Sequence, residues 1–287
     1  MSTDTTSRDT ATRSHDIPTK ELPQGVEIPV LGLGSWQLTG STCRRTVAEG
    51  LEMGYRHLDT AEAYENEKEV GRGLADSGVD RDDVFLTTKV WYENLAPDAV
   101  HAACEDSLDR LGTDYVDLYL IHWPTDRVPL SETVGALKEL RDEGRIRAWG
   151  VCNFTRSWLE ELLELGRPAT NQIEIHPFLV QDELFDACRG WGIPLTAYSP
   201  LARGRVTGDR VLKEIGEAHG KTAAQVALRW SLDRGRIVIP KSSGKEHLRE
   251  NFDVFGFSLD DEELDRIDAL DAGERIIDPS WMDFEER

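Results

Sequence analysis

The sequence lacks any apolar run that approaches the length of a membrane span, so a membrane-spanning protein is not expected. It has only four cysteines, Cys43, Cys104, Cys152 and Cys188, with no Cys-x-x-Cys pair and no neighbouring histidine at metal-ligand spacing. We therefore expect no metal site. Free cysteines in this pattern suit a reducing cytoplasm.

Positive charge is also scarce. The chain carries 33 Lys and Arg residues against 54 Asp and Glu residues, which gives a formal net charge of −21. Nucleic-acid binding needs a basic face, so that class of partner is excluded. Acidic residues spread along the whole chain together with few lysines are typical of a halophile's protein surface; an ordinary acidic cytosolic enzyme is the alternative.

The first residues are rich in Thr, Ser and Asp and contain no apolar segment, so they do not form a secretory signal. We predict a disordered polar tail over residues 1–21 and one domain over residues 22–287. Neither a Gly-rich nor a Ser-rich linker divides the remainder. A chain of 287 residues lies in the usual size range of a (β/α)8 barrel.

Short apolar segments alternate with helical segments along the domain. Residues 22–34 contain two apolar pieces separated by Gly and Pro, which predicts a β-hairpin that plugs the barrel floor and leads into the first strand. The alternation predicts an α/β fold, a (β/α)8 TIM barrel, because strands that alternate with helices form a closed parallel sheet. The eight expected strands are residues 32–36, 55–60, 84–90, 116–122, 146–151, 172–175, 195–198 and 237–240.

Polar residues follow three successive strands. Asp59 and Tyr64 follow the second strand, Lys89 ends the third and His122 ends the fourth. Active sites on parallel barrels form at these strand ends. Taken singly, each residue has a structural explanation, such as a helix cap or a solvated lysine. Together they offer an acid, a cation that stabilises its conjugate base, a carboxylate that orients the cation, and a hydrogen-bond donor for a substrate oxygen.

These residues also carry a resemblance. The chain resembles the aldo-keto reductase family from about residue 25 to residue 278, in the motifs Asp59-Thr60-Ala61-x-x-Tyr64, Thr88-Lys89-x-Trp91 and His122-Trp123-Pro124. The resemblance implies an NAD(P)H-dependent reductase of small aldehydes, ketones, keto-aldehydes or keto-acids, with Tyr64 as the general acid. A Rossmann dehydrogenase is disfavoured, because Gly32-x-Gly34 is not followed by the third glycine of the dinucleotide fingerprint.

The resemblance further implies where the cofactor binds. Asn153 and Gln172 match the residues that hold the nicotinamide carboxamide, and Tyr198 matches the ring that stacks on the nicotinamide. Cys152 departs from the usual Ser, so one carboxamide contact is expected to be weaker. The remaining cofactor residues that the resemblance implies are Ser199, Leu201, Lys241, Ser242, Ser243, His247 and Asn251.

Lys241 and Ser242 are expected to contact a 2′-phosphate and Asn251 the adenine. His247 stands where many family members carry Arg, so NADPH is expected as the cofactor with NADH as the alternative. The substrate wall is expected to consist of Trp36, Trp91 and Trp123, in a site left open by a short C-terminal tail.

Two alternative functions use the same residues. A Schiff-base aldolase would use Lys89 as its nucleophile, and a regulatory subunit would bind the cofactor without turnover. We expect a cytoplasmic monomer whose partner is a small carbonyl substrate, with neither nucleic acid nor membrane as a partner.

Overall fold

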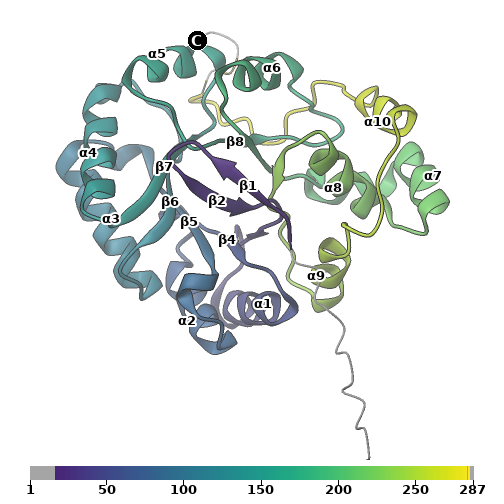
Figure 1. Ribbon diagram of the computed structural model, residues 1–287, viewed down its shortest axis with the longest axis horizontal. Coiled ribbons are helices and arrows are strands. Elements are labelled where there is room, and N and C mark those ends of the chain that lie inside the picture. The colour runs from purple at the N-terminus through teal and green to yellow at the C-terminus, as the bar shows by residue number, and fades with distance from the viewer. Residues whose placement is uncertain (1–16, 283, 285–287) are drawn as a thin grey trace, which may run out of the picture.

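Eight parallel strands form the centre of the molecule (Figure 1). The computed structural model describes residues 17–282 and 284. In chain order the strands are β3 (Leu33–Gly34), β4 (His57–Asp59), β5 (Phe85–Val90), β6 (Val116–Ile121), β7 (Ile146–Cys152), β8 (Asn171–Glu174), β9 (Leu195–Tyr198) and β10 (Ile237–Val238). Each strand pairs with the next one along the chain. The predicted (β/α)8 fold is confirmed, with strand boundaries shifted by up to two residues.

The sheet closes between its first and last strands. Val238 N donates to Val30 O (2.9 Å), and Gly32 N donates to Val238 O (2.8 Å), which joins β10 to the segment before β3. At this seam the strands are short. Gly34 leaves no room for a side chain, because a Cβ there would lie 2.8 Å from Ile239 O. Closure removes the free strand edges that an open sheet would expose.

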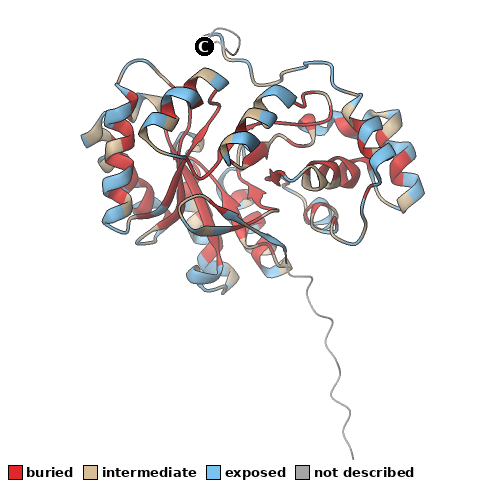
Figure 2. Cartoon of the chain, turned by 45° about the horizontal axis from the view of Figure 1, so that its top comes forward, coloured by how far each residue is buried: buried red, intermediate tan, exposed pale blue. Residues whose placement is uncertain are grey.

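Helices surround the barrel, and Figure 2 shows that their buried sides face the strands while their outer sides are exposed. The buried stripes follow the helical period, as in α3, where Val100, Cys104, Leu108 and Leu111 are buried. The α-helices are α1 (Gly40–Met53), α2 (Glu67–Ser77), α3 (Pro97–Leu111), α4 (Leu130–Asp142), α5 (Arg156–Leu165), α6 (Asp182–Trp191), α7 (Arg210–His219), α8 (Ala223–Asp233), α9 (Lys245–Phe252) and α10 (Asp261–Asp268). The short 3₁₀ turns are η1 (Glu62–Tyr64), η2 (Arg81–Asp83), η3 (Tyr92–Asn94) and η4 (Ala202–Gly208). None of the described helices is long and apolar enough to cross a membrane.

The predicted N-terminal hairpin is present and lies across the barrel (Figure 1). It consists of β1 (Thr19–Leu22) and β2 (Val26–Pro29), paired antiparallel. Leu22 and Ile28 are buried in one cluster with Phe85, Leu118 and Ile237 of the barrel strands, so the hairpin seals the barrel floor with apolar side chains.

The hairpin corrects the predicted boundary of the polar tail. Thr19 pairs with Pro29 and Lys20 with Ile28, so residues 19–21 belong to the folded hairpin and not to a disordered segment over residues 1–21. The polar character of Thr19-Lys20-Glu21 concealed a strand, because an edge strand with one solvent-facing side needs few apolar residues. The predicted tail over residues 1–16 lies outside the described residues.

Candidate active site

Four polar side chains from neighbouring strand ends converge at one end of a cavity. Asp59 ends β4, Tyr64 ends the turn η1 that follows, Lys89 lies in β5, and His122 directly follows β6. Lys89 Nζ donates to Asp59 Oδ1 (2.6 Å) and Thr60 O (2.8 Å), and lies 3.4 Å from Tyr64 Oη. The rings of Tyr64 and His122 meet edge to face, with their centroids 5.6 Å apart. The structure thus brings the four predicted residues together, because parallel pairing aligns the ends of their strands.

Lys89 is fully buried, with 0% of its side chain exposed. Burial by itself lowers the pKa of Lys89. The facing Asp59 carboxylate and the Tyr64 hydroxyl together raise it by a larger amount, so the pKa of Lys89 lies above its ordinary value. Lys89 is therefore a permanent ammonium ion at physiological pH. A protonated amine is not a nucleophile, and this disfavours the Schiff-base aldolase that the sequence left open.

The ionisation of Tyr64 depends on burial and on the neighbouring ammonium. Burial raises the pKa of Tyr64 to about 12, and this outweighs the lowering by the Lys89 ammonium. The Lys89 ammonium does lower the pKa of Tyr64, as a nearby positive charge should, but the effect of burial is larger. At neutral pH Tyr64 is consequently a neutral phenol that still holds the proton it would donate.

His122 is neutral as well. Burial, assisted by the positive charge of Lys89, places the pKa of His122 well below its ordinary value. Its Nδ1 is buried and has no hydrogen-bond partner among the described residues, so Nε2 is the ring nitrogen that can face the cavity. A neutral imidazole can carry a proton on Nε2 and donate a hydrogen bond to an oxygen there.

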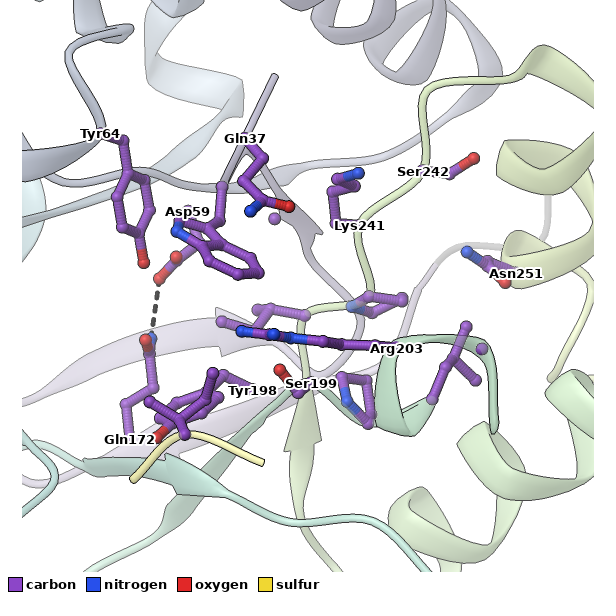
Figure 3. A pocket seen from close by; sticks show the side chains of 18 of the residues that line it. Gln37, Asp59, Tyr64, Gln172, Tyr198, Ser199, Arg203, Lys241, Ser242 and Asn251 are labelled. Atoms are coloured by element: carbon purple, nitrogen blue, oxygen red, sulfur yellow. Dashed lines mark hydrogen bonds between the residues drawn. The ribbon is translucent and has the colours of Figure 1, made fainter. Parts of the chain in front are cut away.

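Next to this group lie the residues expected to hold a nicotinamide. Gln172 Nε2 donates to Asp59 Oδ2 (2.7 Å), an interaction drawn in Figure 3. Tyr198 Oη donates to Asn153 Oδ1 (2.7 Å), and Asn153 has a left-handed backbone with φ of +63°. Cys152 Sγ lies 3.2 Å from Asn153 Nδ2. The Gln172 amide is thus held by Asp59, and the Asn153 amide by Tyr198.

The cavity extends away from Tyr64 toward α9. Its volume is about 720 Å³. Figure 3 shows Tyr64, Asp59 and Gln172 at one end, Ser242 and Asn251 at the other, and Arg203 between them. All of the remaining predicted cofactor residues line it, namely Ser199, Leu201, Lys241, Ser243 and His247. An elongated cavity with carboxamide partners at one end and a lysine and two serines at the other fits an extended dinucleotide.

Aromatic side chains form the wall beside the catalytic end. The three predicted tryptophans, Trp36, Trp91 and Trp123, all line the cavity. Trp91 packs edge to face on His122 at a centroid distance of 5.1 Å. Its backbone N–H donates to Glu62 Oε1, so η1 and the loop that carries Trp91 are fastened to each other.

Among the described residues no group of three or more His, Cys, Asp or Glu side chains is placed to hold a metal ion.

Comparison with known proteins decides the family. The model of the Aldo/keto reductase family matches residues 30–272. The chain belongs to the aldo/keto reductase family. It is therefore an oxidoreductase that reduces carbonyl compounds with a nicotinamide cofactor.

Individual aldo/keto reductases match over most of their length. An aldo-keto reductase of Mycolicibacterium smegmatis is 47% identical over 271 residues, which are 93% of this chain and 98% of the relative. The glyoxal reductase of Bacillus subtilis is 46% identical over 261 residues, covering 90% of this chain and 94% of the relative. Among solved structures, a Bombyx mori aldo-keto reductase in complex with NADP has a TM-score of 0.87 and 35% identity, with 92% of this chain and 95% of that chain covered.

Two further side chains that line the cavity of this aldo/keto reductase were not predicted from the sequence. Gln37 and Arg203 both line it, and the Arg203 guanidinium lies 4.7 Å from the centre of the Trp36 ring. Arg203 has φ of +52° and lies in η4, within the connection of β9 to α7. In the sequence, only the length of that connection, residues 199–209, points to a functional role for Arg203, since long loops in barrels often contribute to function.

The C-terminal tail also contributes to the substrate wall. Trp281 packs on Trp123 with centroids 5.0 Å apart and on Tyr92 at 4.7 Å, and Ile277 lines the cavity. The sequence suggested that a short tail would leave the site open. In the described part of this tail, Ile277 lines the cavity and Trp281 packs on Trp123, so the openness of the site stays a prediction.

Proposed function

We propose that the enzyme transfers a hydride from NADPH to the carbonyl carbon of small or aromatic aldehydes, ketones, keto-aldehydes or keto-acids, and that Tyr64 donates the proton to the oxygen. The observation that supports this most directly is the hydroxyl of Tyr64, which lies 3.4 Å from a buried ammonium at the enclosed end of the cavity. A neutral phenol beside a fixed positive charge is an acid whose conjugate base is stabilised at the moment it forms.

The other three residues have supporting roles in this proposal. The bound cofactor supplies the hydride. Asp59 accepts a hydrogen bond from Lys89, which keeps the ammonium in position near Tyr64. Neutral His122 donates a hydrogen bond to the substrate oxygen, which orients the carbonyl and stabilises the charge that develops there. The intact group weighs against a regulatory subunit that binds the cofactor without turnover.

The walls of the cavity suggest the first substrates to test. Trp36, Trp91 and Trp123 offer apolar contact and few hydrogen-bonding groups, which favours small or aromatic carbonyl compounds. Relatives of this chain include a glyoxal reductase and a 9,11-endoperoxide prostaglandin H2 reductase. Turnover with NADPH and with NADH over a panel that includes glyoxal, benzaldehyde and keto-acids tests the proposal. An enzyme inactive on every carbonyl compound in the panel would contradict it.

The preference for NADPH should depend on Lys241 and His247. A 2′-phosphate carries about −1.5 to −2 charges at pH 7. Lys241 offers a permanent positive charge, whereas a histidine side chain loses its charge as the pH rises through about 5 to 8. Glu250 Oε2 lies 3.1 Å from His247 Nδ1, so part of that charge is already balanced by a carboxylate. We therefore expect a moderate NADPH preference that shrinks between about pH 6 and pH 8.

Three variants test this preference through kcat/KM for both cofactors at one salt concentration. His247→Arg should strengthen it and flatten its pH dependence, and Lys241→Met should remove most of it while sparing NADH. Glu250→Gln should strengthen it without changing Lys241, because it removes a negative charge that lines the cavity next to His247. A ratio independent of pH in the wild-type enzyme would mean that His247 does not reach the phosphate. Better turnover with NADH throughout would also remove Lys241 from that role.

We propose that the enzyme is a halophilic, cytoplasmic monomer. The net charge supports the halophilic assignment, and the free cysteines support the cytoplasmic one. Self-repulsion at −21 should be relieved by salt, since the Debye length falls from about 10 Å at 0.1 M to about 3 Å at 1 M. Salt also weakens exposed ion pairs such as Arg44–Asp76, but solvent already screens such pairs, so they contribute little to stability.

The melting temperature should therefore rise with KCl between 0.1 M and 1 M or more. Thermal denaturation in KCl, with sucrose as a nonionic control, measures this. An unchanged melting temperature would contradict the halophilic assignment and leave the reductase unaffected.

A further inference from the structure

A buried carboxylate outside the catalytic group binds the C-terminal segment. Glu174, the last residue of β8, has no exposed surface. Its Oε1 accepts hydrogen bonds from His176 Nε2 and from Ile276 N, both at 2.8 Å, and its Oε2 accepts one from Ile277 N at 2.8 Å. His176 Nδ1 accepts from Phe178 N, so the proton of this imidazole lies on Nε2 and is donated to Glu174.

These bonds make Glu174 a stable buried anion. Burial by itself raises the pKa of Glu174, but the hydrogen bonds from His176, Ile276 and Ile277 lower it more, so its pKa lies below the ordinary value. A buried carboxylate is tolerated only where donors satisfy it. Two of the three donors are backbone groups about one hundred residues further along the chain.

Other contacts hold the same segment to the loop after β8. Phe178 O accepts from Glu274 N (3.0 Å) and Ala272 N (3.3 Å). The side chain of Gln181 donates to Glu174 O and accepts from Arg275 (3.3 Å). Hydrogen bonds thus join the segment 272–277 to Glu174, Phe178 and Gln181. The Glu174 carboxylate binds the segment at Ile277, where it reaches the cavity.

One of the two anchored residues, Ile277, is itself the described tail residue that lines the cavity. Ile277 lines the cavity, and four residues later Trp281 packs on Trp123 and Tyr92. Trp281 remains 50% exposed, so its own contacts bury only part of the ring. The position of this wall therefore depends on where residues 276 and 277 are fixed.

Strand β8 also connects this anchor to the catalytic group. Side chains two residues apart on a strand lie on the same face. Gln172, two residues before Glu174, donates to Oδ2 of Asp59. The other oxygen of the same carboxylate, Oδ1, accepts from Lys89 and positions it. One face of one strand thus fixes both the catalytic carboxylate and the tail.

We propose that Glu174 is a positioning residue that anchors residues 276–281 as a wall of the substrate cavity and so determines the affinity for bulky carbonyl compounds. It does not touch the reacting atoms. The kinetic part of this inference rests on the proposed function, because it assumes that carbonyl compounds bind between Trp91, Trp123 and the tail.

The test compares Glu174→Gln with the wild-type enzyme in two measurements. A glutamine has one acceptor oxygen, so it cannot accept all three hydrogen bonds, and its NH2 group would face a backbone N–H. Hydrogen exchange followed by mass spectrometry should show exchange of the 272–282 peptide that is about ten-fold faster or more, with strand β8 still protected. This readout does not depend on catalysis, so it also serves if the proposed function fails.

In the kinetic measurement, KM for a bulky aromatic aldehyde should rise about ten-fold in Glu174→Gln, whereas kcat/KM for glyoxal and the affinity for NADPH should change less than two-fold. Trp281→Ala should reproduce the effect on the bulky substrate with normal exchange at Ile276 and Ile277. Glu274→Gln is the matched control, since Glu274 lies in the same segment and pairs with Arg205 at the surface, and it should change neither measurement.

Ile277→Pro provides a second variant, which keeps Glu174 and removes the N–H that donates to Oε2. Because it also replaces a side chain that lines the cavity, it is compared with Ile277→Ala, which keeps this N–H. Ile277→Pro should raise KM for the bulky aldehyde in the same selective way. Unchanged exchange of the tail in Glu174→Gln, or equal KM increases for glyoxal and the bulky aldehyde in both variants, would overturn the proposal. If Glu174→Gln does not fold, the Ile277→Pro result decides alone.

Discussion

Tyr64→Phe is expected to lower kcat by about 10²–10⁴-fold or more while leaving NADPH binding nearly unchanged. The substitution removes only the hydroxyl 3.4 Å from Lys89 Nζ. Lys89 keeps its bonds to Asp59 and Thr60, and the ring retains its edge-to-face contact with His122. The variant should therefore fold normally, with the loss confined to proton donation.

Steady-state kinetics with one aldehyde and a titration of NADPH fluorescence measure the two expectations for Tyr64→Phe. Tyr92→Phe is the matched control, because Tyr92 belongs to the outer aromatic wall, where its ring packs on Trp91 and Trp281. Loss of that hydroxyl should leave kcat within about two-fold, since it lies outside the group that donates the proton. A Tyr64→Phe enzyme with more than a tenth of the wild-type kcat would exclude Tyr64 as the acid.

Lys89→Met should abolish turnover and also destabilise the fold. Removing the ammonium leaves the buried Asp59 carboxylate without its cation and takes away the charge that stabilises a Tyr64 phenolate. Breaking a buried ion pair by removing one partner costs about 3–5 kcal/mol. For a chain of this size that corresponds to a fall in melting temperature on the order of 10 °C.

The double variant Asp59→Asn/Lys89→Met separates the two effects. Replacing both partners removes the unpaired charge, so most of the lost melting temperature should return, whereas turnover should not. In the reverse reaction, oxidation of an alcohol, any residual rate of Lys89→Met should appear only at higher pH than in the wild type, because the Tyr64 pKa rises without Lys89. Recovered activity in the double variant would show that Lys89 serves only stability.

Local patterns in the sequence were sufficient to predict the barrel. The strands are short segments rich in apolar residues, and helices such as α3 have a buried stripe at helical spacing, so both signals lie within about ten residues. The hairpin was predicted from the same kind of signal in Val26–Pro29. The tail boundary failed at Thr19, because the partner that makes those polar residues a strand is on the other side of the turn.

The sequence by itself predicted the fold, through its alternation of strands and helices, and the convergence of Asp59, Tyr64, Lys89 and His122, because parallel strands align their ends. The proposed cofactor residues came from the resemblance of their motifs to the aldo-keto reductase family. Only the tertiary structure decided the ionisation of Tyr64, which depends on the balance between burial and a charge from another strand. It alone decided the position of Arg203 in the cavity, the packing of Trp281 on Trp123, and the bonds of Glu174 with Ile276 and Ile277. Contacts between residues so far apart in the chain leave no periodic trace in the sequence, because either partner looks like an ordinary loop or strand residue until the fold brings the two together.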